Sequence, residues 1–282
     1  MPSSGAAAGF GLLSAATWGG SDFAGGLGAR RASSLLITAS GQIISLLVLI
    51  GLVLGFHLPV PSRFQLACAA IGGFEGALAL AIFYRALAMG AMGLTAALTG
   101  LLTAFVPVVF EFFHTGRPAP LTAIGLVIGF VAIWLITHTP ATTSGVNSPP
   151  RALMLGAIAG LGFGAQLILF KLGSAGGVLW ALTSGRIAGV GAILTVIAFA
   201  PPPGPWRGFW LAGVVSGSFD TIGNVFYMLA ARFGRLDVAA VICSLYPAGT
   251  ILLAAIVLHE RPTRRQFVGM AVALIAVALL SL

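Results

Sequence analysis

Three polar residues stand at helical spacing in an otherwise apolar stretch of the chain. Asp220, Asn224 and Tyr227 occupy positions i, i+4 and i+7 within the segment FDTIGNVFY at 219–227. A helix would therefore carry all three side chains on one face. In a membrane helix a carboxylate costs about 2.5–3.5 kcal/mol to insert, and it usually faces a bundle interior, a partner or a water-filled cavity. The spacing indicates a transport site.

Two further acids in apolar runs extend this chemistry. Asp22 lies four residues after Trp18, and Glu75 lies in another apolar run. Aromatic rings beside carboxylates suit an organic cation, because a cation over Trp or Tyr gains up to about 2 kcal/mol when it is desolvated. A structural role is the alternative, with Glu75 paired to Arg85 or Asp220 paired to Arg186, because breaking a buried ion pair is costly.

The composition places these residues in a membrane. Hydrophobic residues make up 59% of the 282 residues, charged residues 7%, and the mean hydropathy is +1.07, whereas soluble domains carry about 25% charged residues. A spanning helix needs about 20 apolar residues, so about ten helices fill the chain and leave no room for a soluble domain. The net charge of +8 comes from basic residues near helix ends and reflects topology, so no nucleic acid partner is expected.

Apolar runs between charged or Pro/Gly-rich separators predict ten transmembrane helices. Their ranges are 7–29, 34–56, 65–88, 93–113, 119–138, 152–172, 177–199, 208–231, 237–258 and 265–282. Because the first residues lack a basic segment, we expect no cleavable signal peptide. A Pro-, Ser- and Thr-rich connection divides five helices from five, which predicts a first unit at 1–140, a linker at 141–151 and a second unit at 152–282.

An offset of 144 residues brings the two units into register. Gly20, Gly73 and Gly125 meet Gly164, Gly217 and Gly269, and Arg117-Pro118 meets Arg261-Pro262. Each unit has an odd number of helices, so the second unit must enter the membrane in the opposite orientation. Inverted repeats are a transporter architecture with a midplane substrate site. The predicted fold is therefore an all-α integral membrane protein built from two inverted five-helix repeats.

The offset also completes the predicted site. Asp22 meets Gln166, and Asp220 meets Gly76, next to Glu75. The predicted substrate-binding residues are Trp18, Asp22, Glu75, Tyr84, Gln166, Asp220, Asn224, Tyr227 and Tyr246. Glu75 and Asp220 are also the candidates for proton coupling, because substrate and proton would compete for a carboxylate. No catalytic residue, metal site or cofactor is predicted, since the two cysteines cannot form a familiar metal site by themselves.

The chain resembles the EamA branch of the drug/metabolite transporter superfamily. The resemblance lies in FGLLSAATWGGSDFAGG at 10–26, in the two five-helix units, and in YPAGTILLAAIVLHERPTRRQFVGMAVALIAVALL at 246–280, with Pro247 and Glu260. It implies an inner-membrane carrier of small metabolites, with a cavity lined by helices 1, 3, 4, 6, 8 and 9 and with cytoplasmic termini. In the first unit Gly116 stands where Glu260 falls, and the count of loop arginines leans toward the opposite orientation.

These observations favour a secondary transporter of a small cationic, amine-bearing or amphiphilic metabolite, working by alternating access with a proton as a candidate coupling ion. The alternative is an exporter of neutral or aromatic amino acids. A channel and a membrane enzyme are less well supported, because no nucleophile and base cluster at a helix end and the loops are short. No ATP-binding GxxxxGK[ST] run is present. The expected partners are the substrate and the lipid bilayer, for a monomer or homodimer.

Overall fold

The computed structural model describes residues 4–89, 92–137, 150–202, 208–257 and 263–280. Most of the predicted linker and Glu260 lie outside these ranges. The described helices are α1 (Ser4–Ala29), α2 (Ser34–Gly55), α3 (Arg63–Ala88), α4 (Met92–His114), α5 (Pro120–Thr137), α6 (Pro150–Ser174), α7 (Val178–Phe199), α8 (Trp210–Phe233), α9 (Leu236–Cys243), α10 (Tyr246–Val257) and α11 (Arg264–Leu280).

Each predicted helical range coincides with a helix except for one or two residues at some of its ends, which confirms the all-α fold class. The predicted ninth helix is the exception in detail, because it consists of α9 and α10. Pro247 has no N–H, and its ring would clash with the carbonyl four residues earlier. That carbonyl belongs to Cys243, the last residue of α9. The break therefore follows from the proline.

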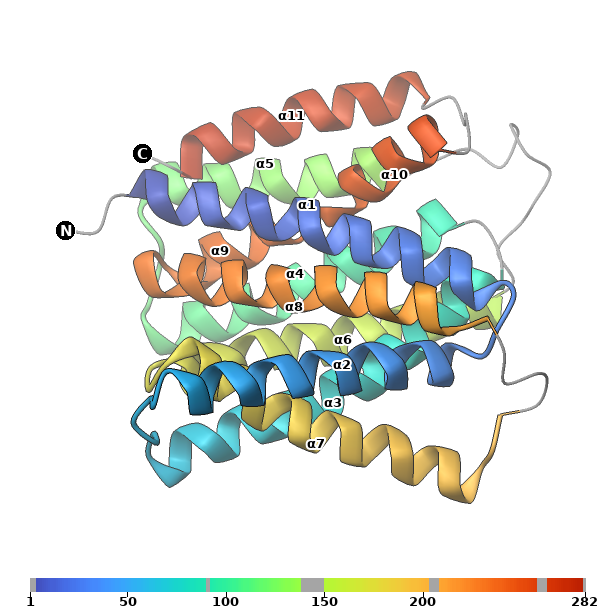
Figure 1. Ribbon diagram of the computed structural model, residues 1–282. Coiled ribbons are helices and arrows are strands. Elements are labelled where there is room, and N and C mark those ends of the chain that lie inside the picture. The colour runs from blue at the N-terminus through green and yellow to red at the C-terminus, as the bar shows by residue number, and fades with distance from the viewer. Residues whose placement is uncertain (1–3, 90–91, 138–149, 203–207, 258–262, 281–282) are drawn as a thin grey trace.

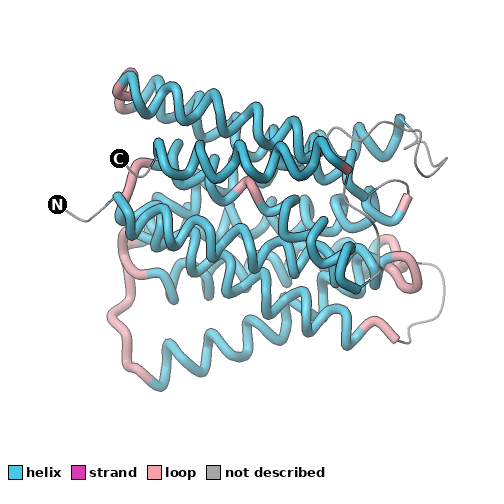
Figure 2. The backbone as a smooth tube through the Cα atoms, turned by 90° about the horizontal axis from the view of Figure 1, so that it is seen from above, coloured by secondary structure: helices cyan, strands magenta, loops and turns pink. Residues whose placement is uncertain are grey.

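The helices run side by side along one common direction, and the connections gather at the two ends of the bundle (Figures 1 and 2). Among the described residues, five stretches are long and apolar enough by themselves to cross a membrane: Ser34–Gly55, Arg63–Ala88, Pro150–Ser174, Val178–Phe199 and Leu236–Leu253. Large apolar side chains such as Phe113 (82% exposed) and Phe199 (88%) stand on the outside. An exposed apolar exterior of this kind suits contact with lipid.

The helix pairs that surround the centre of the bundle are α1 with α8 and α3 with α6, while α5 packs against α11 at the periphery. In Figure 1, α1 starts at the end of the bundle where α11 finishes, and α6 starts at the opposite end. This is the direction that an inverted second unit requires. The duplication itself stays a prediction.

Candidate functional site

A cavity lies among the central helices. Its walls come from α1, α3, α4, α6, α8 and α10. The lining residues are Trp18, Asp22, Leu80, Thr103, Phe163, Gln166, Leu167, Asp220, Asn224 and Tyr246. Six of the nine residues predicted from the sequence are therefore brought together here.

Asp220 and Asn224 line the cavity from its α8 side. Asp220 accepts a hydrogen bond at Oδ2 from Nη2 of Arg186 on α7, and the two residues form an ion pair. The Asn224 Nδ2 group donates to Asp220 Oδ1 at 3.1 Å and to the Asp220 carbonyl at 2.8 Å. The i, i+4 spacing thus becomes a direct contact, and both carboxylate oxygens of Asp220 are engaged within the protein.

Asp22, on α1, is in a different situation. Its side chain is buried, with 6% of the residue exposed, and it makes no hydrogen bond or ion pair with any residue that the structure describes. It lines the same cavity as Trp18, one turn away along α1. A buried carboxylate without a partner is costly, so Asp22 is the group in this cavity that most needs a ligand of positive charge.

Two more polar atoms of the cavity lining are buried without a partner among the described residues. They are the Asn224 Oδ1 atom and the Tyr246 hydroxyl. Because the Asn224 amide N–H groups already point at Asp220, its free oxygen can only accept a hydrogen bond. The Tyr246 hydroxyl can donate or accept. Together with Asp22, these groups offer a surplus of acceptors to a ligand that donates hydrogen bonds.

Aromatic side chains form part of the same wall. Trp18, Phe163 and Tyr246 line the cavity, and the Trp18 ring stacks on Tyr227 with centroids 5.9 Å apart. Tyr227 itself is fully buried, donates to the Leu167 carbonyl and does not line the cavity. It therefore supports the Trp18 ring from behind and is not positioned to contact a ligand.

Two other predicted residues also lie outside the cavity. Tyr84 bonds through its hydroxyl to the Ser21 hydroxyl at 3.0 Å and borders a smaller hollow instead. Glu75 is partly exposed and lines neither space, and its Oε1 atom has no hydrogen-bond partner among the described residues. No ion pair joins Glu75 to Arg85 in the described part of the chain, so the structural alternative for Glu75 is not realised.

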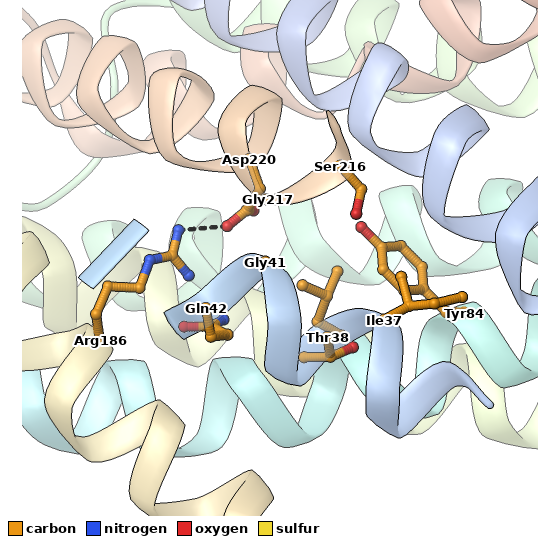
Figure 3. Close-up of a pocket in the computed structure, with 10 residues that line it drawn as sticks. Ile37, Thr38, Gly41, Gln42, Tyr84, Arg186, Ser216, Gly217 and Asp220 are labelled. Carbon is orange, nitrogen blue, oxygen red and sulfur yellow. Dashed lines mark hydrogen bonds and ion pairs between the residues drawn. The ribbon is translucent and has the colours of Figure 1, made fainter. Parts of the chain in front are cut away.

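The smaller hollow lies between α2, α3, α7 and α8 (Figure 3). Its polar lining includes Thr38, Gln42, Tyr84, Arg186, Ser216 and Asp220. Asp220 and Leu80 border both spaces, so these two side chains form the partition between them. Arg186 approaches Asp220 from the side of the hollow, as the dashed line in Figure 3 shows.

Phe163, Leu80, Leu167 and Thr103 are lining residues outside the predicted binding set. A signal existed for Phe163, which precedes Gln166 by three positions on the same helix and therefore shares its face. Thr103 also belongs to the contact between α4 and α6, because its hydroxyl donates to the Gly160 carbonyl at 3.4 Å. The apolar residues carry no pattern that separates cavity lining from ordinary helix packing.

Comparison with known proteins finds a family match for the second part of the chain. Residues 150–282 match the EamA-like transporter family, and no curated protein is significantly similar to the chain in sequence. A solved structure described only as the crystal structure of a protein superposes with a TM-score of 0.72 at 18% identity, over 97% of this chain and 95% of that chain. At this identity the likeness shows the fold alone. Residues 150–282 thus form a domain of the EamA-like transporter family, within the drug/metabolite transporter superfamily, in a chain whose helices are those of a multi-pass membrane protein.

Proposed function

We propose that the protein is a secondary transporter that moves a small organic cation across a bacterial-type inner membrane by alternating access. The observation that carries the proposal is Asp22, a buried carboxylate that faces the cavity without a partner among the described residues. An ammonium group would satisfy Asp22, and its further N–H groups would reach acceptors such as Asn224 Oδ1 and the Tyr246 hydroxyl. Charge-assisted hydrogen bonds of this kind are about twice as strong as neutral ones.

The aromatic wall supports the same class of substrate. Trp18, Phe163 and Tyr246 present ring surface to the cavity, and rings attract a desolvated cation through their faces. The rings also accommodate an apolar substituent, which suits an amine with a hydrophobic body. A neutral or aromatic amino acid would also fit the rings, but its carboxylate would lie in the same cavity as Asp22 and would be repelled.

Alternating access is supported by how the helices pair around the cavity. The contacts of α1 with α8 and of α3 with α6 exchange with each other under the offset of 144 residues. Two units related in this way, 1–140 and 152–282 with a linker at 141–151, can rock about a site at their interface. We place both termini in the cytoplasm, in line with the family resemblance, and a reporter fused to the C-terminus checks this orientation.

Proton coupling follows from the same carboxylate. A proton on Asp22 removes the charge that attracts the cation, so the proton and the substrate would compete for one group. Cation binding should therefore weaken as the pH falls through the titration of Asp22. Asp220 is a poorer coupling group than its position suggested, because its carboxylate is already paired with Arg186.

The test is counterflow in proteoliposomes that contain the purified full chain. Labelled primary amines, quaternary ammonium compounds and neutral aromatic amino acids are offered to wild type and to Asp22→Asn. We expect saturable counterflow of a monovalent amine, with apparent affinity reduced about 10- to 150-fold in the variant, the equivalent of about 1.5–3 kcal/mol for a hydrogen bond to a charged group. Amino acid counterflow that is unchanged in Asp22→Asn would overturn the cationic substrate, and ohmic currents would indicate a channel.

A further inference from the structure

Arg186 lies beside the substrate cavity and contributes a buried positive charge there. The residue is 5% exposed, stands on α7, and directs Nη2 at Asp220 Oδ2 and at the Thr221 hydroxyl, 3.2 Å away. It does not line the main cavity, whereas Asp220, its ion-pair partner in Figure 3, lines both the cavity and the hollow. Arg186 therefore acts on the cavity through Asp220 and through its charge.

The charged side chains that border the cavity or the adjoining hollow are Asp22, Asp220 and Arg186. Arg186 and Asp220 form an ion pair and cancel each other. The second Asp220 oxygen is also occupied, by the amide of Asn224. When Asp22 is ionised, a single negative charge therefore remains, and it belongs to Asp22.

We propose that Arg186 is a specificity-determining residue that limits the cavity to one net negative charge and so selects singly charged cations over doubly charged ones. This proposal rests on the proposed cation transport. A dication could give one ammonium group to Asp22, but its second charge would have to compete with Arg186 for Asp220. An unpaired charge in a site of low dielectric constant is strongly unfavourable, so a diamine should bind more weakly than a monoamine of equal length.

In this scheme Asp220 is a positioning residue. It accepts the Asn224 Nδ2 hydrogen bonds through its carboxylate and its carbonyl. This fixes the amide so that Oδ1 is left as the acceptor for a ligand. A substrate would contact Asp22 and Asn224 Oδ1 while Asp220 stayed bound to Arg186.

The experiment measures the binding of hexylamine and 1,6-diaminohexane to the purified full chain in detergent, in wild type and in three variants. In Arg186→Gln the cavity gains a second free carboxylate, and the affinity ratio of diamine to monoamine should rise at least about tenfold. In Asp220→Asn the unpaired guanidinium opposes the ligand, and monoamine affinity should fall at least about tenfold. The double variant Arg186→Gln/Asp220→Asn restores one net negative charge, so its monoamine affinity and its ratio should return to within about threefold of wild type.

Loss of monoamine binding in the double variant would overturn the proposal, because it would make Asp220 a direct ligand. An unchanged ratio in folded Arg186→Gln would also overturn it. If Arg186→Gln does not fold, the fall in Asp220→Asn and the recovery in the double variant decide the matter by themselves. Failure of wild type to bind either amine would instead defeat the proposed function, whereas Asp22-dependent monoamine binding with no response to Arg186 would defeat this inference alone.

Discussion

The two helix interfaces that border the cavity, α1 with α8 and α3 with α6, correspond under the offset of 144 residues but differ in chemistry. The corresponding residues are Asp22 with Gln166, Asp220 with Gly76, and Asn224 with Leu80. One interface carries both carboxylates of the cavity, while its counterpart offers an amide, a glycine and a leucine. Two helix interfaces that correspond under the offset therefore surround a cavity whose carboxylates lie on one side.

At two helix crossings behind the cavity, by contrast, the corresponding positions are alike. α2 and α8 touch at Gly41 and Gly217, and α3 and α7 touch at Gly73 and Gly185, so the corresponding positions hold the same residue. A Cβ on Gly217 would lie 2.3 Å from the Gly41 Cα, and one on Gly73 would lie 2.1 Å from the Gly185 carbonyl oxygen. Positions related by the offset hold the same residue where the helix backbones meet, and they hold different residues where side chains line the cavity.

We expect the largest effect, a loss of stability, from substituting the glycines at these two crossings. Gly73→Ala and Gly217→Ala each place a methyl group against backbone that cannot rotate away, so each should lower the free energy of unfolding by about 3 kcal/mol or more. Thermal unfolding and the yield of monodisperse protein in detergent measure the loss. Gly191→Ala on α7 and Gly51→Ala on α2 are matched controls, because a Cβ at either position meets no atom within 4 Å. If Gly73→Ala were as stable as wild type, α3 and α7 would not approach each other closely at Gly73 and Gly185.

The next prediction tests whether the carboxylate of Asp22, on the α1–α8 side of the cavity, binds the substrate. Asp22→Gln should weaken monoamine binding about 10- to 150-fold, since a hydrogen bond to a charged group is lost. Adding Gln166→Asp returns a carboxylate to the same cavity from the corresponding position on α6, and it should recover at least about tenfold of that loss. Isothermal titration of each variant measures the change.

A matched control puts the new carboxylate outside the main cavity. Gln65, in the first turn of α3, lines neither the cavity nor the hollow, so Asp22→Gln/Gln65→Glu should bind as weakly as Asp22→Gln. Recovery in this control, or its absence in the variant with Gln166→Asp, would show that the cavity charge does not set affinity.

The helices could be predicted from the sequence because apolar runs of membrane length are unambiguous, and only the break at Cys243 needed the chemistry of Pro247. The residues of the candidate site were harder to predict. The offset pairs Asp220 with Gly76, and Glu75 is the neighbouring residue; one residue turns a helix by about 100°. Gly76 consequently meets the Gln166 side chain, whereas Glu75 points elsewhere.

The aromatic residues show a second limit of sequence patterns. Tyr227 shares the helical face of Asp220 and Asn224, as the i+7 spacing requires. Its ring is nevertheless covered by Trp18, and its hydroxyl is taken by the Leu167 carbonyl. Spacing gives the direction of a side chain on its own helix, but what another helix places in front of it depends on packing.

The smallest expected effect concerns Glu75, the acid that near-symmetry had paired with Asp220. Because it lines neither space, Glu75→Gln should change monoamine affinity by less than about twofold and leave the pH dependence of binding as in wild type. Its Oε1 atom has no partner among the described residues, so replacing the acid with an amide should not lower the unfolding temperature.

Glu111→Gln provides the contrast for this last substitution. Glu111 is 3% exposed and faces Lys171, with Oε1 and Nζ 3.8 Å apart, so its neutralisation leaves an unpaired cation and should lower the unfolding temperature without touching the cavity. A loss of amine affinity or of pH dependence in Glu75→Gln would instead put a carboxylate on the α3 side of the site. The charge would then be shared between the two units, and the contrast between their interfaces would disappear.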